Sequence, residues 1–367
     1  MKKIGFYLAH PAHFHLFKNV IESLVQKDCK VLVVYNEKDV LHELISTSSF
    51  FEISHRVKSN KKVESKIALL LQFFMKNWGA FVQFYKFKPD VVVGTPILIS
   101  LIGRILPYKS IIVNEDDFDI VKKTANLGYP HADTILCPEV CRTTKFDKKS
   151  IKYESYHELA YLHPNHFKAD LKIATNYINN KKPYFILRFA KLFAHHDDGI
   201  TGINTEVAAR VVKILKPHGN IYITSERTLE PEFEKYRISI HAKDMHHVMA
   251  FASLYIGDSQ TMAAESGVLG TPFIRFNDFV GQISYLDELE NKYYLGYGIK
   301  TNNIENLYQK IKDLLEMESC KDVFKARRYK MLTEKIDYSA FLTWFIDNYP
   351  ESKNEMVKNS DYQYKFK

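Results

Sequence analysis

Two halves of the chain repeat the same alternation of apolar, strand-like segments with amphipathic, helical segments, and this pattern limits the possible folds more than any other feature. In the first half the strand-like segments lie at 3–9, 30–35, 90–93, 110–113 and 134–137. The alternation restarts after residue 183, with strand-like segments at 184–188, 220–224, 238–241 and 254–257. Strands separated by helices form βαβ units and parallel sheets. We therefore predict an α/β protein with two Rossmann-like domains facing a central cleft at the carboxyl ends of the strands.

A chain of 367 residues is too long for one small core and suits two domains. The alternation weakens before the run Asn179-Asn180-Lys181-Lys182-Pro183, which is typical of a connection between domains. The predicted divisions are a first domain at 1–165, a linker at 166–183, a second domain at 184–336, a helix at 337–350, and a polar, disordered tail at 351–367.

Charge and cysteine content narrow the possible partners. The net charge of +8 is spread along the chain, whereas nucleic-acid binders more often cluster basic residues on one element. We therefore expect no nucleic-acid partner, while an anionic substrate and an acidic membrane surface suit the charge equally well. Cys137 and Cys141 form a lone Cys-x3-Cys, so neither a disulfide framework nor a zinc site is expected. We expect a cytoplasmic protein with no bound metal and no cofactor.

The most informative local motif is the strand–turn–helix at 254–269, followed by a second strand-like pair at 273–274. Small residues at such a turn let backbone N–H groups and the positive helix end face a phosphate. Glu265 lies about two turns into the helix, where its carboxylate could reach a ribose held above the turn. The alternative is an ordinary βαβ turn without a ligand.

Three further groups of polar side chains follow predicted strands. His10 and His13 end the first strand and open the first helix, and His13 is the first candidate for a general base. The alternative is that these histidines cap the helix or bond to the backbone. Arg188 ends the first strand of the second half, where an arginine can pair with a diphosphate.

The acidic run Glu115-Asp116-Asp117 follows the strand at 110–113. Its carboxylates could bind a cation, position an acceptor hydroxyl or act as a base. An N-terminal cap of the next helix is an equally good interpretation, because acidic residues complement the helix dipole there.

The helical stretch at 63–87 carries more bulky apolar residues than one buried stripe needs. Part of it, at 66–87, could contact a membrane surface or a partner, and the alternative is a helix packed in the core. No apolar run approaches the ~20 residues that span a bilayer.

The run Met245–Ser259, continued through Glu265 to Pro272, resembles the donor-binding region of GT-B glycosyltransferases. It is similar to the N-acetylglucosaminyltransferase that forms lipid II, and to UDP-N-acetylglucosamine 2-epimerase. In the epimerase motif, Asp258, Ser259 and Glu265 match at the same spacing, although Gln260-Thr261 replace two glycines. The opening His-Pro-Ala-His resembles a smaller GT-B family, formerly of unknown function, whose members often accompany surface-polysaccharide genes.

The resemblance implies a role for each matching residue on the donor side. Ser259, Gln260 and Thr261 would hold a nucleotide diphosphate. Glu265 would accept hydrogen bonds from the ribose, and Arg188 would counter the diphosphate charge. Ile240 or His241 would contact the base through backbone groups.

On the acceptor side, His13 matches the histidine of the first strand–helix turn in many GT-B transferases, and the helix at 337–350 would cross back to the first domain. The implied function is a metal-independent glycosyltransferase at the inner face of the membrane. It would use a nucleotide-sugar donor, with UDP the favoured nucleotide, and a glycan or lipid-linked acceptor in surface polysaccharide or glycolipid biosynthesis. A sugar-nucleotide 2-epimerase or hydrolase and a non-catalytic sugar-nucleotide or glycan-binding module are the alternatives.

Overall fold

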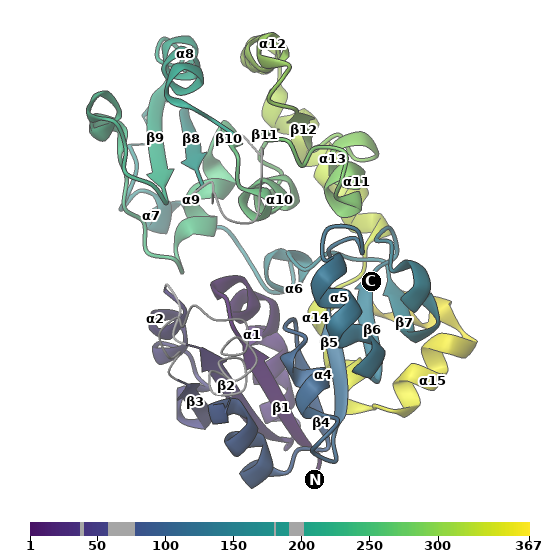
Figure 1. Ribbon diagram of the computed structural model, residues 1–367. Coiled ribbons are helices and arrows are strands. Elements are labelled where there is room, and N and C mark those ends of the chain that lie inside the picture. The colour runs from purple at the N-terminus through teal and green to yellow at the C-terminus, as the bar shows by residue number, and fades with distance from the viewer. Residues whose placement is uncertain (37–39, 58–77, 180, 191–201) are drawn as a thin grey trace. The chain divides into compact units, whose positions relative to one another are not determined.

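The computed structural model describes residues 1–36, 40–57, 78–179, 181–190 and 202–367. The chain divides into two compact units (Figure 1). The first unit comprises residues 1–166 and 335–367, and the second comprises residues 167–334. The chain therefore passes between the units twice, once after His166 and once after Glu334.

The first unit is built on a seven-stranded sheet in the order β3-β2-β1-β4-β5-β6-β7. Every neighbouring pair of these strands is parallel, as the βαβ alternation predicted. The strands are β1 (Lys3–Leu8), β2 (Lys30–Asn36), β3 (Ser54–Val57), β4 (Val91–Gly94), β5 (Lys109–Val113), β6 (Thr134–Pro138) and β7 (Ser150–Tyr153).

Helices cover both faces of this sheet. On one face, a helical stretch at 78–87 joins α4 (Leu98–Ile102) and α5 (Lys122–Gly128) over a core that includes Tyr7 and Ile112. A second group packs together around α1, which contacts both α6 and α14. The members of this group are α1 (Pro11–Gln26), α6 (Leu159–Leu162) and α14 (Tyr338–Asp347), and α2 (Leu41–Ser46) contacts α1 as well. The helix predicted at 337–350 thus packs in the first unit.

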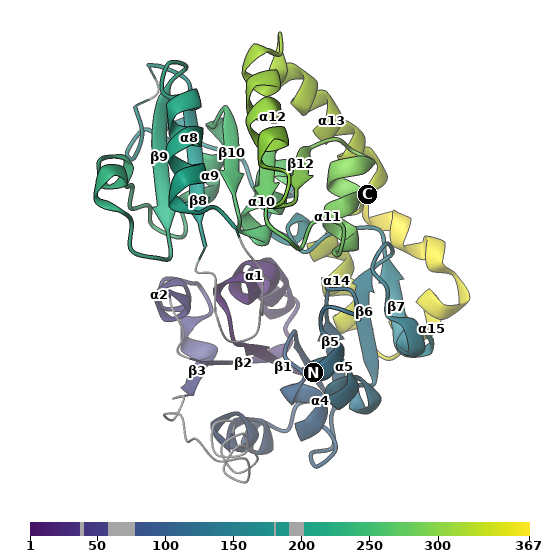
Figure 2. The same ribbon diagram turned by 45° about the horizontal axis from the view of Figure 1, so that its top comes forward.

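The second unit holds a five-stranded sheet in the order β12-β11-β10-β8-β9, again with parallel pairs throughout. Its strands are β8 (Tyr184–Phe189), β9 (Asn220–Ser225), β10 (Leu254–Gly257), β11 (Phe273–Phe276) and β12 (Gly296–Ile299). On one face, α8 (Thr205–Leu215) and α12 (Ile304–Glu316) enclose an apolar core (Figure 2).

On the other face, α10 (Gln260–Leu269) packs against α9 (Met245–Phe251) and against β11. Gly267 of α10 lies so close to Phe273 that an added Cβ would come within 2.8 Å of its ring. The remaining helices are α7 (Leu171–Ala174), α11 (Ser284–Asn291) and α13 (Cys320–Glu334).

The structure differs from the predictions at the connection between the domains. Residues 167–183, which were expected to form a linker, belong to the second unit, where α7 packs against α9. The segment at 238–241, which was expected to be a strand, does not form one. Near it, an isolated parallel bridge joins Arg237 to Ile223. The parallel sheet of the second unit therefore has five strands without this segment. One of the five, β12, was not predicted from the alternation.

The prediction of a disordered tail after Pro350 is wrong, because α15 (Glu351–Lys358) and a 3-10 helix at Ser360–Phe366 pack on the first unit. The Gln363 Oε1 atom accepts a hydrogen bond of 2.7 Å from the Glu154 backbone N–H. The Tyr362 ring stacks on Trp344 at a centroid distance of 4.7 Å. A few such contacts outweigh the polar composition of the segment as a whole.

Candidate functional site

The turn from β10 into α10 places backbone N–H donors at the start of a helix. Ser259 is the N-cap, and its hydroxyl accepts a long hydrogen bond of 3.4 Å from the Met262 N–H. Within the described part of the chain, the Gln260 and Thr261 N–H groups make no hydrogen bond. The first turn of the helix itself carries no acidic side chain, and its first N–H groups lie at the positive end of the helix dipole.

Asp258 fixes this turn to two other segments. Its Oδ1 atom accepts a 2.6 Å hydrogen bond from the Ala190 N–H, and its Oδ2 atom accepts a 3.4 Å bond from the Ile203 N–H. A Cβ at Gly202 would lie 2.8 Å from Oδ2, which explains the glycine there. Burial raises the pKa of Asp258 to about 6, although these N–H donors oppose the rise. The sequence motif included Asp258, but the pattern gave no hint of this anchoring role.

Arg188 lies directly beside the turn, because the register of β8 and β10 pairs it with Gly257. Its guanidinium pairs with Glu226, and its side chain is 17% exposed. The Nε atom is buried and has no hydrogen-bond partner among the residues that the structure describes. Arg188 is thus a cationic group with a remaining donor at the same sheet edge as the start of α10.

A second arginine, Arg227, was not predicted. It follows β9, donates a 2.8 Å hydrogen bond from Nη2 to the Ile203 carbonyl, and lies 5.2 Å from the centre of the Phe189 ring. Its Nε atom is also buried without a partner in the described ranges. Its place after a strand carboxyl end was a signal that sequence reasoning could have used.

Glu265 lies in the second turn of α10 and is buried. Its Oε1 atom is 2.9 Å from Nε2 of His246 on α9. Ile240 and His241 lie in the loop that precedes α9. The Ile240 backbone makes no hydrogen bond with the described residues, whereas the His241 carbonyl accepts one from the Asp244 N–H. The structure therefore brings Arg188, Ser259, Gln260 and Thr261 to one edge, with Glu265 behind them on the same helix.

In the first unit, His10 and His13 both use Nδ1 as an acceptor. His10 is the N-cap of α1 and accepts a 3.2 Å hydrogen bond from the Ala12 N–H. His13 accepts a 3.1 Å bond from the Ala9 N–H. A neutral imidazole whose Nδ1 accepts an N–H carries its proton on Nε2. In the neutral form both rings therefore carry their proton on Nε2, and His10 fits the helix-cap interpretation.

Within the acidic run, Glu115 is the residue whose carboxyl pKa is raised most. Its Oε2 atom accepts a 3.0 Å hydrogen bond from the His157 backbone N–H, and its Oε1 atom is 3.4 Å from Nδ1 of His157. Burial raises the pKa of Glu115 well above its ordinary value, and the nearby Glu158 raises it further. Burial also lowers the pKa of His157 to about 3, so this ring is neutral.

The other two members of the run have different surroundings. Burial raises the pKa of Asp116, and the charge of Asp117 adds to the rise. Asp117 is fully buried and accepts hydrogen bonds from the Arg142 backbone N–H at 2.8 Å and from its Nε at 3.2 Å. Asp117 therefore serves to hold the loop that contains Arg142.

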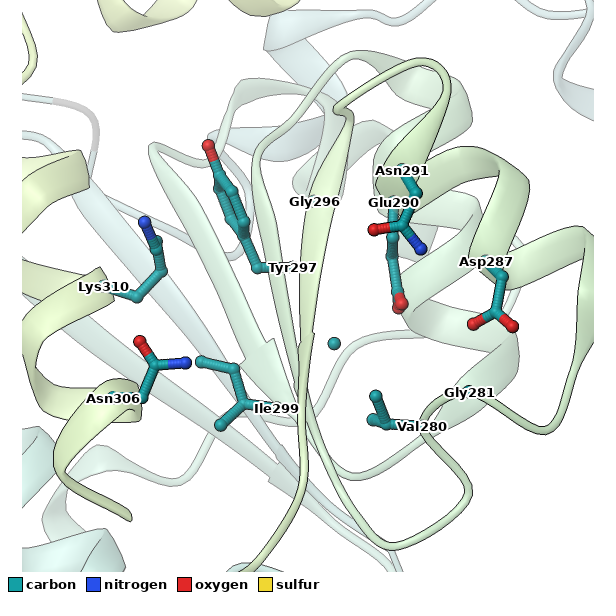
Figure 3. A pocket seen from close by; sticks show the side chains of 11 residues that line it. Val280, Gly281, Asp287, Glu290, Asn291, Gly296, Tyr297, Ile299, Asn306 and Lys310 are labelled. Atoms are coloured by element: carbon teal, nitrogen blue, oxygen red, sulfur yellow. The ribbon is translucent and has the colours of Figure 1, made fainter. Parts of the chain in front are cut away.

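A pocket of about 220 Å³ lies beside β12, between side chains of α11 and α12 (Figure 3). Glu290 lines this pocket and is paired with the buried Arg275 at 2.9 Å. None of the predicted site residues lines it. Across the described ranges, no group of three or more His, Cys, Asp or Glu side chains is arranged to hold a metal ion.

Of the stretch at 66–87, residues 66–77 lie outside the described residues. In the described part, three aromatic rings stack in a row on the helix. Trp78 stacks on Phe81 at 5.3 Å, and Phe81 stacks on Tyr85 at 6.4 Å. Trp78 is 59% exposed and Tyr85 is 61% exposed. Among the helices described, none is both long enough and apolar enough to cross a bilayer.

No protein-family model matches the sequence, and no curated protein matches it. Solved structures match in fold. A putative UDP-N-acetylglucosamine 2-epimerase from Listeria monocytogenes has a TM-score of 0.67 and 14% identity, with 96% of each chain covered. MnaA from S. aureus, solved with UDP, has a TM-score of 0.64 and 15% identity, covering 96% of this chain and 98% of that one.

MurG from Acinetobacter baumannii has a TM-score of 0.56 and 14% identity, covering 95% of this chain and 99% of that one. At such identities a likeness shows the fold alone. Together with the two parallel sheets, these matches confirm the predicted GT-B fold of two Rossmann-like domains.

The raised pKa of Asp258 makes stability depend on pH. Because the folded-state pKa is about 6 and the ordinary value is 3.8, the folded state binds this proton more tightly than the unfolded state. The contribution is therefore fully present below the ordinary value and is lost as pH rises through 6. We expect the free energy of unfolding of wild type minus that of Asp258→Asn to fall by about 2.4 kcal/mol between about pH 4 and about pH 7.

Urea unfolding across this pH range measures the difference. The asparagine does not titrate, and the hydrogen bond that it loses shifts stability by the same amount at every pH. A difference that rises with pH would mean that the Asp258 pKa is depressed, contrary to the burial argument.

Proposed function

We propose that the protein is a metal-independent glycosyltransferase that uses a nucleotide-sugar donor, with UDP as the nucleotide. Its acceptor would be a glycan or lipid-linked sugar in surface polysaccharide or glycolipid biosynthesis. The observation that carries the proposal is the register that sets Arg188 beside Gly257, at the start of a helix whose first N–H groups make no hydrogen bond with the described residues. A guanidinium and a helix N-terminus at one sheet edge form a site for a diphosphate.

The donor side follows from this site. The Gln260 and Thr261 N–H groups and the Ser259 hydroxyl would bind the diphosphate oxygens, and Arg188 would offset the charge that develops as the nucleoside diphosphate departs. These groups supply the positive potential that other transferases take from a metal ion. Glu265 would accept hydrogen bonds from the ribose hydroxyls. The backbone groups of Ile240 and the adjacent His241 would contact the base.

On the acceptor side, we propose Glu115 as the general base. A raised carboxyl pKa makes a stronger base and brings it closer to the working pH. Asp116, whose pKa is raised as well, is the second candidate. His13 and His10 use Nδ1 to accept backbone N–H groups, so we assign them to positioning the substrate and not to proton abstraction. Asp117 is committed to Arg142 and is the weakest candidate of the run.

A sugar-nucleotide 2-epimerase or hydrolase is the second candidate function. The presence of two neighbouring carboxyl groups with raised pKa values, Glu115 and Asp116, favours it, because epimerisation needs both an acid and a base. A non-catalytic sugar-nucleotide or glycan-binding module would use the same donor residues without turnover. The donor site serves all three functions, so the product of the reaction decides between them.

We also propose peripheral contact with a membrane through residues 66–87, which suits a lipid-linked acceptor at the inner face. Support comes from the exposed Trp78 and Tyr85, since these residue types favour the membrane interface. Replacing both by Ser should weaken sedimentation with anionic vesicles by about tenfold, and added salt should weaken it further. Tyr329→Ser on α13, where Tyr329 is 71% exposed, is the control. Binding that is unchanged by both the substitutions and the salt would exclude membrane contact through this helix.

The diphosphate site is tested by the Arg188→Met variant. We expect it to bind UDP at least about tenfold more weakly than wild type, because a charge-assisted hydrogen bond is lost, while uridine affinity changes little. Isothermal titration calorimetry measures both. Arg210→Met is the matched control, since Arg210 is also paired with a glutamate in the second unit, at 3.7 Å. Equal UDP affinity in wild type and Arg188→Met would remove the donor assignment.

The reaction itself is tested by incubating the protein with UDP, GDP, CDP and ADP sugars, with and without glycan acceptors. A transferase releases nucleoside diphosphate and forms a glycoside only when the acceptor is present. An isomerised sugar formed without acceptor would identify the epimerase, and binding without any turnover would identify the module.

If Glu115 is the base, kcat/KM rises with pH through its raised pKa, because only the ionised carboxylate accepts the proton. We expect Glu115→Gln to lower kcat/KM by about 10²- to 10⁴-fold and to abolish that pH limb. The exposed Glu139 gives the control variant Glu139→Gln. A pH profile that survives in Glu115→Gln would move the base to another residue.

A further inference from the structure

A buried histidine contacts the carboxylate that the proposed donor site uses for the ribose. The Nε2 atom of His246 lies 2.9 Å from Oε1 of Glu265, and both side chains are 8% exposed. His246 is the second residue of α9, and Glu265 is in the second turn of α10, so the contact joins two helices that pack together. The sequence motif contained His246, but neither spacing nor charge gave it a role.

The segment that enters the second unit holds the neighbouring rings in place. Phe167, the first residue of this unit, meets the His246 ring edge-on at 6.1 Å and an angle of 81°, and it lies 4.9 Å from the His247 ring. Nδ1 of His247 accepts a 2.9 Å hydrogen bond from the Asp170 N–H. The orientation of the His246 ring is thus restricted by packing, in addition to its contact with Glu265.

We propose that His246 is a positioning residue: its Nε2–H fixes the Glu265 carboxylate in the orientation that accepts hydrogen bonds from the ribose hydroxyls of the donor. The inference rests on the proposed donor role of Glu265. A carboxylate that is free to turn about its last bond must be ordered when the ligand binds, and ordering reduces affinity. Because the imidazole holds Oε1, the plane of the carboxylate is fixed before the donor binds. Donor binding therefore does not bear the entropy cost of ordering this side chain.

The geometry separates two substitutions that are equally polar. A glutamine at 246 can place its amide N–H near the position of the imidazole Nε2, whereas an asparagine is shorter and does not reach it. We therefore expect His246→Gln to retain the function of His246 and His246→Asn to lose it. Because both are neutral amides, a difference between them reports on reach and not on polarity or charge.

The readout is the preference for UDP over 2′,3′-dideoxy-UDP, which lacks the hydroxyls that Glu265 would bind. We expect His246→Asn to reduce this preference by about tenfold, and His246→Gln to leave it close to the wild-type value. Calorimetric titration gives the two dissociation constants, and thermal unfolding of each variant shows that it is folded. A purely structural role would change the melting temperature without changing the preference between the two ligands.

The Glu265→Ala variant, which has no acceptor for the ribose hydroxyls, separates failure of this inference from failure of the proposed function. If Glu265→Ala keeps the wild-type preference for UDP, then Glu265 does not bind the ribose and the donor assignment of that residue falls. If Glu265→Ala loses the preference while His246→Asn keeps it, then Glu265 binds the ribose without help from His246, and the positioning role is overturned.

Discussion

Parallel pairing between β8 and β10 is the constraint on which the candidate donor site depends. The register sets Arg188 opposite Gly257, the last residue before the turn into α10. A side chain at position 257 would come within 2.5 Å of the Tyr255 hydroxyl and 2.9 Å of Arg188 Cβ, so the glycine lets the arginine and the helix start lie together. A slip of one residue would turn Arg188 to the opposite face of the sheet. The pairing of a cation with a helix end is therefore a property of strand register.

Three carboxyl groups, each largely buried, show how the surroundings separate their roles. Asp258 accepts two backbone N–H groups and holds chain segments together. Glu265 faces the imidazole of His246. Glu115 faces His157, which burial keeps neutral, and no described lysine or arginine forms an ion pair with it. An ionised carboxylate without a cationic partner is costly to bury, which makes Glu115 the member best suited to exchange a proton.

The long apolar strands and the amphipathic helices were predictable, because their periodic patterns are local. The two-sheet fold and the place of Arg188, Ser259 and Gln260 at strand carboxyl ends followed from that periodicity. The strand β12 was not predicted, since Gly296 and Gly298 break the apolar pattern, and its glycines make room for Phe273 and Glu290. The packed segment after Pro350 was missed for a related reason. Its order depends on contacts such as Gln363 with Glu154, which are 209 residues apart and leave no local trace.

The same distinction between local and long-range contacts changes the assignment of the base. The place of the first motif, at the end of the first strand, favoured His13, because neutral imidazole can accept a proton near pH 7. The hydrogen bond from the Ala9 N–H occupies Nδ1, so the neutral ring presents a donor at Nε2 and has no free lone pair for a proton. Glu115 differs from its neighbours in the acidic run because it accepts a hydrogen bond from the His157 N–H, 42 residues further along the chain. No sequence motif contains both residues. The proposed donor site can thus be inferred from a local motif, whereas the proposed base depends on residues that only the fold brings together.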